Sequence, residues 1–172
     1  MTLDGLGPDF DDFVRQSSTS LLRTAYLLTG DHGHAEDLLQ TALLRTARHW
    51  RTAKAQPAAY ARRVLANLAK DRWRHRSRRP AETGQWAEPG HDGSNGQLTL
   101  RHTLLPAVLQ LPMRQRAVLV LRYFEDLSIE ETAATLDCSV GTVKSQTHHA
   151  LARLRELLGE EVLPTKEIDH AH

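Results

Sequence analysis

Short polar side chains recur at helical spacing between Thr142 and His149, toward the carboxyl end of the chain. At about 100° per residue, Ser145, His148 and His149 fall on one side of a helix, with Thr142 and Lys144 at its edges. Hydroxyl, imidazole and ammonium groups form the hydrogen bonds by which proteins contact bases and phosphates. A helix that presents them fits the major groove of duplex DNA. The same pattern is compatible with a helical hairpin whose polar face is only solvated.

The residues from 127 to 158 predict the two helices that would position these groups. Ser128 and Glu131 stand three residues apart, which is the spacing of a capping box at the start of a helix. Ser139 is a suitable N-cap for a second helix, whose first-turn amides suit a phosphate. The apolar side of that second helix comprises Val143, Ala150, Leu151, Leu154, Leu157 and Leu158. The stretch therefore predicts a helix-turn-helix.

A second candidate surface lies on the helix predicted from 58 to 75. Arg62, Arg63, Lys70 and Trp73 fall on one face of this helix. Basic groups beside an exposed aromatic ring fit a nucleic-acid strand whose bases have been unstacked, whereas duplex DNA needs only the charges. The alternative is that Trp73 completes the hydrophobic core.

The composition restricts the class of protein. The formal net charge of the 172 residues is only +1, but residues 51–79 contain ten Lys or Arg and one acid, while the first fifty residues contain four bases and seven acids. This asymmetry favours a local polyanion-binding surface. The single cysteine, Cys138, excludes an internal disulfide and suggests a reducing compartment. We expect no membrane span, signal peptide or zinc site, because no segment has the required apolar length or ligand spacing.

The run from Ser139 to Ser145, SVGTVKS, is similar to the −35-reading helix of the extracytoplasmic-function sigma factors of bacterial RNA polymerase. The residues from Leu111 to Ala133 resemble the segment that precedes this helix in the same family. The variant resembles the actinobacterial SigE-like group of the sigma-70 family, over about residues 10 to 158. The resemblance implies an alternative sigma factor, cytoplasmic and not itself an enzyme, that binds core RNA polymerase and directs it to promoters.

The resemblance also implies three binding surfaces, carried over residue by residue. The surface that reads −35 DNA comprises Thr142, Lys144, Ser145, His148 and His149. The surface that reads −10 DNA and helps to open it comprises Arg62, Arg63, Asn67, Lys70 and Trp73. The motif that docks on the β′ coiled coil of core polymerase comprises Glu36, Asp37, Leu39 and Gln40. Further implied partners are the β flap, promoter DNA and an anti-sigma factor, and no cofactor is implied.

The reading helix departs from the family pattern at one position. His149 stands where many relatives carry arginine, and His148 precedes it. Arginine is a permanent cation that can form paired hydrogen bonds to guanine or phosphate, whereas neutral histidine has one donor. We therefore expect weaker or altered −35 recognition.

We expect an all-α fold of two small domains. Residues 1–80 would form sigma region 2, residues 81–97 a flexible linker, residues 98–158 sigma region 4 and residues 159–172 a flexible tail. Residues 51–57 would form the loop that, in the family, helps to capture a flipped base. Two other classes remain open: a stand-alone helix-turn-helix regulator of duplex DNA, and an anti-sigma or adaptor protein built from helical interaction modules.

Overall fold

The computed structural model describes residues 6–77 and 104–159, and every regular element in these two ranges is a helix. The amino-terminal helices are α1 (Pro8–Thr29), α2 (His32–Arg48), α3 (Trp50–Ala53) and α4 (Pro57–Ser77). A helical segment at 104–109 precedes α6 (Met113–Leu119), η2 (Val120–Phe124), α7 (Ile129–Leu136) and α8 (Val140–Leu158). The all-α prediction is confirmed. The linker predicted at 81–97, the tail beyond residue 159 and the first residues of the region predicted at 98–158 lie outside the described residues.

Local chemistry accounts for several helix ends. Gly30 follows α1 with φ of 74°, a left-handed conformation that glycine adopts without strain. The Asp31 carboxylate caps α2 by accepting the amide of His34 at 2.8 Å. At the start of α7, the Ser128 amide donates to the Glu131 carboxylate at 2.8 Å, and the Glu131 amide donates to the Ser128 hydroxyl at 3.0 Å. The predicted capping box is therefore confirmed.

The loop predicted from 51 to 57 is wrong in its first half, because Trp50–Ala53 forms the short helix α3. The Lys54 amide donates to the Trp50 carbonyl at 2.8 Å and closes this turn. The Trp50 ring packs edge-on against Phe10, with ring centroids 5.1 Å apart, and is 9% exposed. A four-residue helix has too few residues to show a helical period, so this turn is set by a tertiary contact that the sequence pattern does not contain.

The helix that begins after Pro112 changes in its second half, where Val120–Phe124 forms a π-helix, η2. The Glu125 amide donates to the carbonyl of Val120, five residues earlier, at 3.0 Å. Tyr123 and Phe124 on this widened turn are 49% and 46% exposed. Single π-turns of this kind are often found at functional sites.

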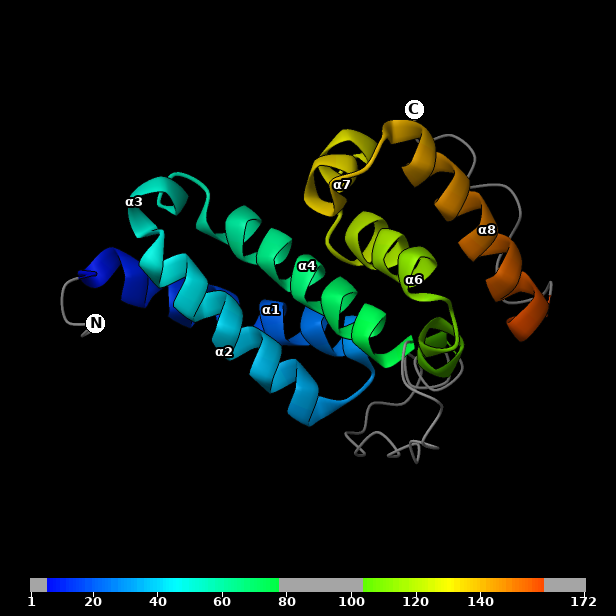
Figure 1. Ribbon diagram of the computed structural model, residues 1–172, viewed down its shortest axis with the longest axis horizontal. Coiled ribbons are helices and arrows are strands. Elements are labelled where there is room, and N and C mark those ends of the chain that lie inside the picture. Colours follow the sequence, from blue (N-terminus) through cyan, green and yellow to red (C-terminus); the bar gives the residue numbers. More distant parts are fainter. Residues whose placement is uncertain (1–5, 78–103, 160–172) are drawn as a thin grey trace.

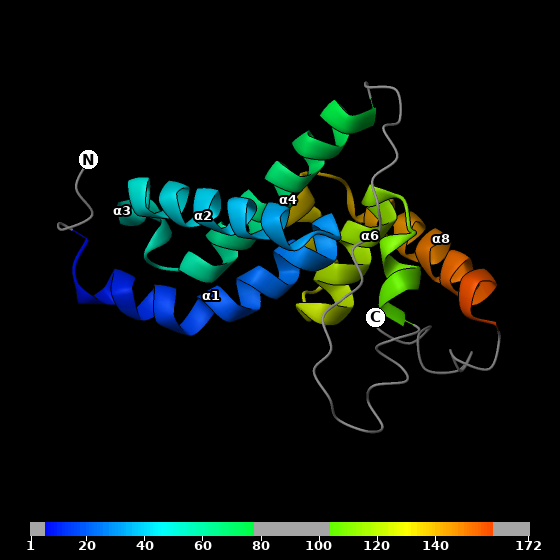
Figure 2. The ribbon, with the colours of Figure 1, turned by 90° about the horizontal axis from the view of Figure 1, so that it is seen from below.

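The two groups of helices pack against each other. The core of α1, α2 and α4 also takes in Met113, Ala117 and Val120 from α6 and η2. Separate apolar clusters join α6 to α8 and α7 to α8. In Figure 1, α4 lies between α2 and the pair formed by α6 and α7. Figure 2 shows that α8 lies on the side of α6 that faces away from α1 and α2. None of the described helices is long and apolar enough to span a bilayer.

Candidate nucleic-acid and polymerase interfaces

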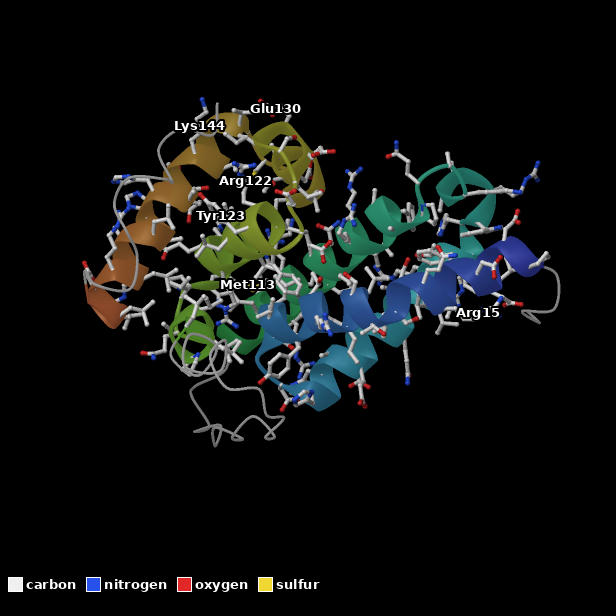
Figure 3. The ribbon with its side chains drawn as sticks, turned by 180° about the vertical axis from the view of Figure 1, so that it is seen from behind. Arg15, Met113, Arg122, Tyr123, Glu130 and Lys144 are labelled. Atoms are coloured by element: carbon white, nitrogen blue, oxygen red, sulfur yellow. The ribbon has the colours of Figure 1, made fainter. Side chains whose placement is uncertain are left out.

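The first turns of α8 present the polar face predicted from the sequence. The Ser139 hydroxyl accepts the Thr142 amide at 3.1 Å, and the two hydroxyl oxygens lie 2.9 Å apart, so the Thr142 side chain belongs to the helix cap. Val143 is fully buried in the cluster shared with α7, which turns the opposite side of α8 outward. Lys144 and Ser145 are exposed on this outer side, and Lys144 lies at the edge of the molecule in Figure 3.

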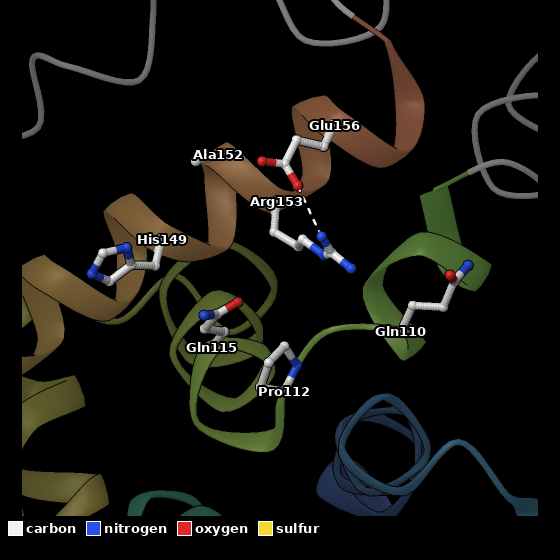
Figure 4. Close-up of a pocket in the computed structure, with 7 residues that line it drawn as sticks. All are labelled: Gln110, Pro112, Gln115, His149, Ala152, Arg153 and Glu156. Atoms are coloured by element: carbon white, nitrogen blue, oxygen red, sulfur yellow. Dashed lines mark hydrogen bonds and ion pairs between the residues drawn. The ribbon is translucent and has the colours of Figure 1, made fainter.

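Two histidines continue this face on the next turn. His148 and His149 are both exposed, and their rings make an edge contact with centroids 5.8 Å apart. His149 also lines an open pocket between α6 and α8, together with Gln110, Pro112, Gln115, Ala152, Arg153 and Glu156 (Figure 4). Within the pocket, Arg153 and Glu156 form an ion pair of 2.9 Å. Along the outer face of α8, the ammonium of Lys144 and the hydroxyl of Ser145 are therefore followed by the imidazoles of His148 and His149.

The predicted −10 face of α4 is only partly open to solvent. Arg63 and Trp73 are exposed, and the 43% exposure of Trp73 shows that its ring does not complete the core. Asn67 and Lys70 are half-buried. The Arg62 side chain is 22% exposed and is turned toward residues of the carboxyl-terminal helices. The face is therefore a mixture of free and covered groups.

Arg62 contacts a carboxylate from the other half of the chain. Its Nη1 lies 3.3 Å from Oε2 of Glu125, whose side chain is 7% exposed. Thr24 of α1 donates its hydroxyl hydrogen to Oε1 of the same carboxylate. Glu125 is not among the site residues predicted from the sequence, because its partners are 63 and 101 positions away and no local pattern links them. One acid thus joins α1 and α4 to the end of η2.

The predicted polymerase-docking motif lies on α2. Glu36, Asp37 and Gln40 are exposed, whereas Leu39 is half-buried and packs against the core. Leu44, one helical turn after Gln40, is 50% exposed and extends this face with an apolar group. Leu44 follows Gln40 by four residues, so helical spacing alone could have placed it on the same face as the predicted docking motif. The α2 face therefore combines carboxylates, an amide and an exposed leucine, a composition suited to a helical protein partner.

The described residues also include acids, histidines and one free thiol, Cys138, outside these surfaces. No group of three His, Cys, Asp or Glu side chains within residues 6–77 and 104–159 is arranged to hold a metal ion. Cys138 is a half-buried free thiol, and burial raises its pKa, which makes it a poor nucleophile. In Figure 1 the α2 and α8 surfaces lie far apart, so they are suited to separate macromolecular contacts.

Known proteins match the chain on both sides of the predicted linker. Residues 13–79 match the family model for Sigma-70 region 2, and residues 101–154 match the model for Sigma-70 region 4. The chain is 42% identical over 163 residues to the RNA polymerase sigma-E factor of Streptomyces coelicolor, covering 94% of this chain and 92% of that protein. It is also 33% identical over 175 residues to the ECF RNA polymerase sigma factor SigE of Mycolicibacterium smegmatis. This match covers 93% of this chain and 65% of that protein.

Solved structures share this arrangement of helices. The sigma factor RpoE of Bartonella quintana, in complex with the anti-sigma factor NepR, matches with a TM-score of 0.71 and 27% identity, over 88% of this chain and 98% of that one. CnrH, in complex with the cytosolic domain of CnrY, shows the same fold with a TM-score of 0.62 and 21% identity, over 87% and 86%. Sigma factors are DNA-recognition subunits of RNA polymerase and not enzymes. This chain belongs to the SigE-like extracytoplasmic-function sigma factors of the sigma-70 family, and it is an alternative sigma factor that directs promoter-specific transcription initiation.

Proposed function

We propose that α8, α4 and α2 are the surfaces through which this sigma factor reads −35 DNA, opens −10 DNA and docks on core polymerase. The observation that carries the proposal is the exposure of Trp73 on a basic helix. An unpaired base can stack on an indole only where the ring is open to solvent, and duplex binding does not require such a ring. The exposed Arg63 on the same helix is available to the phosphates of that strand.

For the −35 element, the groups on α8 divide between two roles. Lys144, at the edge of the outer face, contacts phosphate and contributes affinity for any sequence. Ser145, His148 and His149 face base edges and contribute the choice of sequence. Thr142 helps to hold the first turn, whose free amides meet a phosphate at the helix N-terminus.

For protein partners, the exposed motif on α2 docks on the β′ coiled coil, and Leu44 adds an apolar contact. Tyr123 and Phe124, half exposed side by side on η2, offer an apolar surface to the β flap. An anti-sigma factor is a further partner, because the similar sigma factor RpoE was solved in complex with one. The protein works in the cytoplasm, where core polymerase is found.

Reconstituted transcription tests this function. Core polymerase would be incubated with a fragmented genomic DNA library, with or without the full chain, and the 5′ ends of the transcripts sequenced. The expected result is a set of starts that appear only with the chain and share two upstream sequence blocks. If the chain adds no starts to those made by core polymerase alone, the proposed function is wrong.

A further inference from the structure

Two imidazoles lie side by side on the outer face of α8. His148 and His149 are exposed, and their ring centroids are 5.8 Å apart. Within residues 6–77 and 104–159, neither ring has a hydrogen bond or an ion pair. The nitrogens of both rings are therefore available to a partner that approaches this face.

The pocket beside His149 supplies no unpaired negative charge. Its uncharged lining residues come from α6 and from the segment before it, and they are Gln110, Pro112 and Gln115. Its charged lining residues, Arg153 and Glu156 of α8 itself, form an ion pair of 2.9 Å with each other. The exposed charge of α6 is also basic, at Arg114. The one acid that lines the pocket is thus already neutralised.

Helix α7, which packs against the first turns of α8, carries three acids. Glu130 and Glu131 lie in its first turn, and Asp137 follows its last residue. Glu131 accepts the Ser128 amide, and in the described part of the chain none of the three acids bonds to either imidazole. On α8 itself, the charged residue one turn before His148 is the cation Lys144. The described residues therefore include no carboxylate that holds a proton on these rings.

We propose that His148 and His149 take up protons when α8 enters the major groove, so that −35 reading by this sigma factor is coupled to pH. The proposal rests on the −35 role given to α8 above. An imidazole gains or loses its proton between about pH 5 and about pH 8. The phosphates beside the groove supply the negative charge that the free protein lacks, and an opposite charge favours the protonated form. Two adjacent imidazolium ions repel each other, so the second proton depends most on the DNA.

The direction of the coupling follows from proton linkage. Bound DNA favours the protonated rings, so the complex holds more protons than the free protein. The added affinity is fully present at acid pH and is lost as the pH rises through the range in which the bound rings release their protons. Each added positive charge near a phosphate also releases a counterion, so the coupling should appear in the salt dependence as well.

The first test measures binding of the full chain to a fluorescent, random-sequence duplex of about 20 base pairs, at about pH 6 and about pH 8 and at several salt concentrations. Wild type should bind about tenfold more tightly at the lower pH, with a steeper salt dependence there. His148→Gln with His149→Gln should lose most of this difference. His32→Gln with His49→Gln removes two exposed imidazoles from the amino-terminal region and is the matched control, which should keep it. Equal losses in the two double variants, or no pH dependence in wild type, would overturn the proposal.

The second test measures the protons directly. Titration calorimetry near pH 7, in two buffers with different ionisation enthalpies, gives the number of protons taken up when the same duplex binds. Wild type should take up about one proton more than the His148→Gln, His149→Gln protein. His149→Arg, which places a permanent cation at one of the two positions, should take up fewer protons than wild type and bind more tightly at about pH 8. Equal proton uptake by wild type and the double glutamine variant contradicts the coupling.

Lys144→Ala separates this proposal from the function on which it rests. If it weakens duplex binding at both pH values while wild type and the double glutamine variant share one pH profile, the proton coupling is wrong and the −35 role of α8 stands. If neither Lys144→Ala nor the double glutamine variant changes duplex binding at either pH, the −35 role of α8 is overturned and the coupling with it.

Discussion

Arg116 of α6 donates a hydrogen bond to the carbonyl oxygen of Leu28, 3.2 Å away at the end of α1. Its other terminal nitrogen reaches the carbonyls of Leu109 at 2.7 Å and Leu111 at 3.1 Å. Burial lowers the pKa of Arg116. The guanidinium thus lies against carbonyls from the ends of two helices, where the helix dipoles favour a positive charge. Arg116 therefore joins the two regions at a second polar point, apart from Glu125.

Replacing this arginine should destabilise the whole fold. Arg116→Met keeps the length of the side chain but removes the donors for three carbonyls, which should lower the free energy of unfolding by about 2–4 kcal/mol. Urea denaturation followed by circular dichroism measures the change. Arg114→Met, at an exposed position of the same helix, should stay within about 0.5 kcal/mol of wild type. Equal losses in both variants would show that the three carbonyl contacts contribute nothing.

The Asp31 cap of α2 should make the free energy of unfolding depend on pH. The hydrogen bond from the His34 amide holds the pKa of Asp31 below its usual value of 3.8. A carboxyl with a lowered folded-state pKa stabilises the fold above the unfolded value, and this contribution is lost as the pH falls through the folded pKa. Asparagine also caps helices but does not titrate. The advantage of wild type over Asp31→Asn in unfolding free energy should therefore shrink from about pH 6 to about pH 2.5, and a constant difference would contradict this account.

Reversing one charge on α2 should weaken polymerase docking. Asp37 is exposed, so Asp37→Arg should leave helix content unchanged while reducing affinity for core polymerase by about tenfold or more, because a like charge now faces a basic partner. Fluorescence anisotropy with labelled sigma factor measures the affinity. Asp11→Arg, an exposed reversal on α1, is the control. Unchanged affinity in Asp37→Arg would place the docking surface elsewhere.

Removing the exposed indole should impair promoter opening more than duplex binding. Trp73→Ala loses a stacking surface worth roughly 1–3 kcal/mol once a base is exposed. Permanganate footprints at saturating protein measure opening, and a gel shift with −35 duplex measures binding. Trp73→Phe keeps an aromatic face and should retain most of the opening. If Trp73→Ala opens DNA as well as wild type, stacking on this ring plays no part.

Local patterns in the sequence account well for the helices and their outer faces. The capping residues Ser128 and Ser139 and the helical period of α8 depend on neighbours within one or two turns, so the sequence displays them directly. The same period placed Trp73 on one face of its helix with Arg62, Arg63 and Lys70, and the exposure of its ring agrees with that placement.

Contacts between distant segments could not be predicted in the same way. Glu125 pairs with Arg62 across 63 positions, and a single acid between two helices carries no sign of its partner. The four residues of α3 are too few for a helical period, and their turn depends on the contact of Trp50 with Phe10. The packing of region 4 on region 2 was missed for the same reason, because an apolar helix face does not specify which helix covers it.

Comparing the transcription starts made with three forms of the protein tests whether α8 reads −35 DNA. Core polymerase with wild type, Lys144→Ala or His149→Arg would transcribe the same genomic library, and the sequences upstream of all starts would be aligned. Lys144→Ala should lower yield at all starts without changing either sequence block, since a phosphate contact carries no sequence choice. His149→Arg should change the preferred bases in the upstream block and leave the downstream block as in wild type. If His149→Arg leaves the upstream block unchanged, or changes only the downstream block, the assignment of −35 reading to α8 is contradicted.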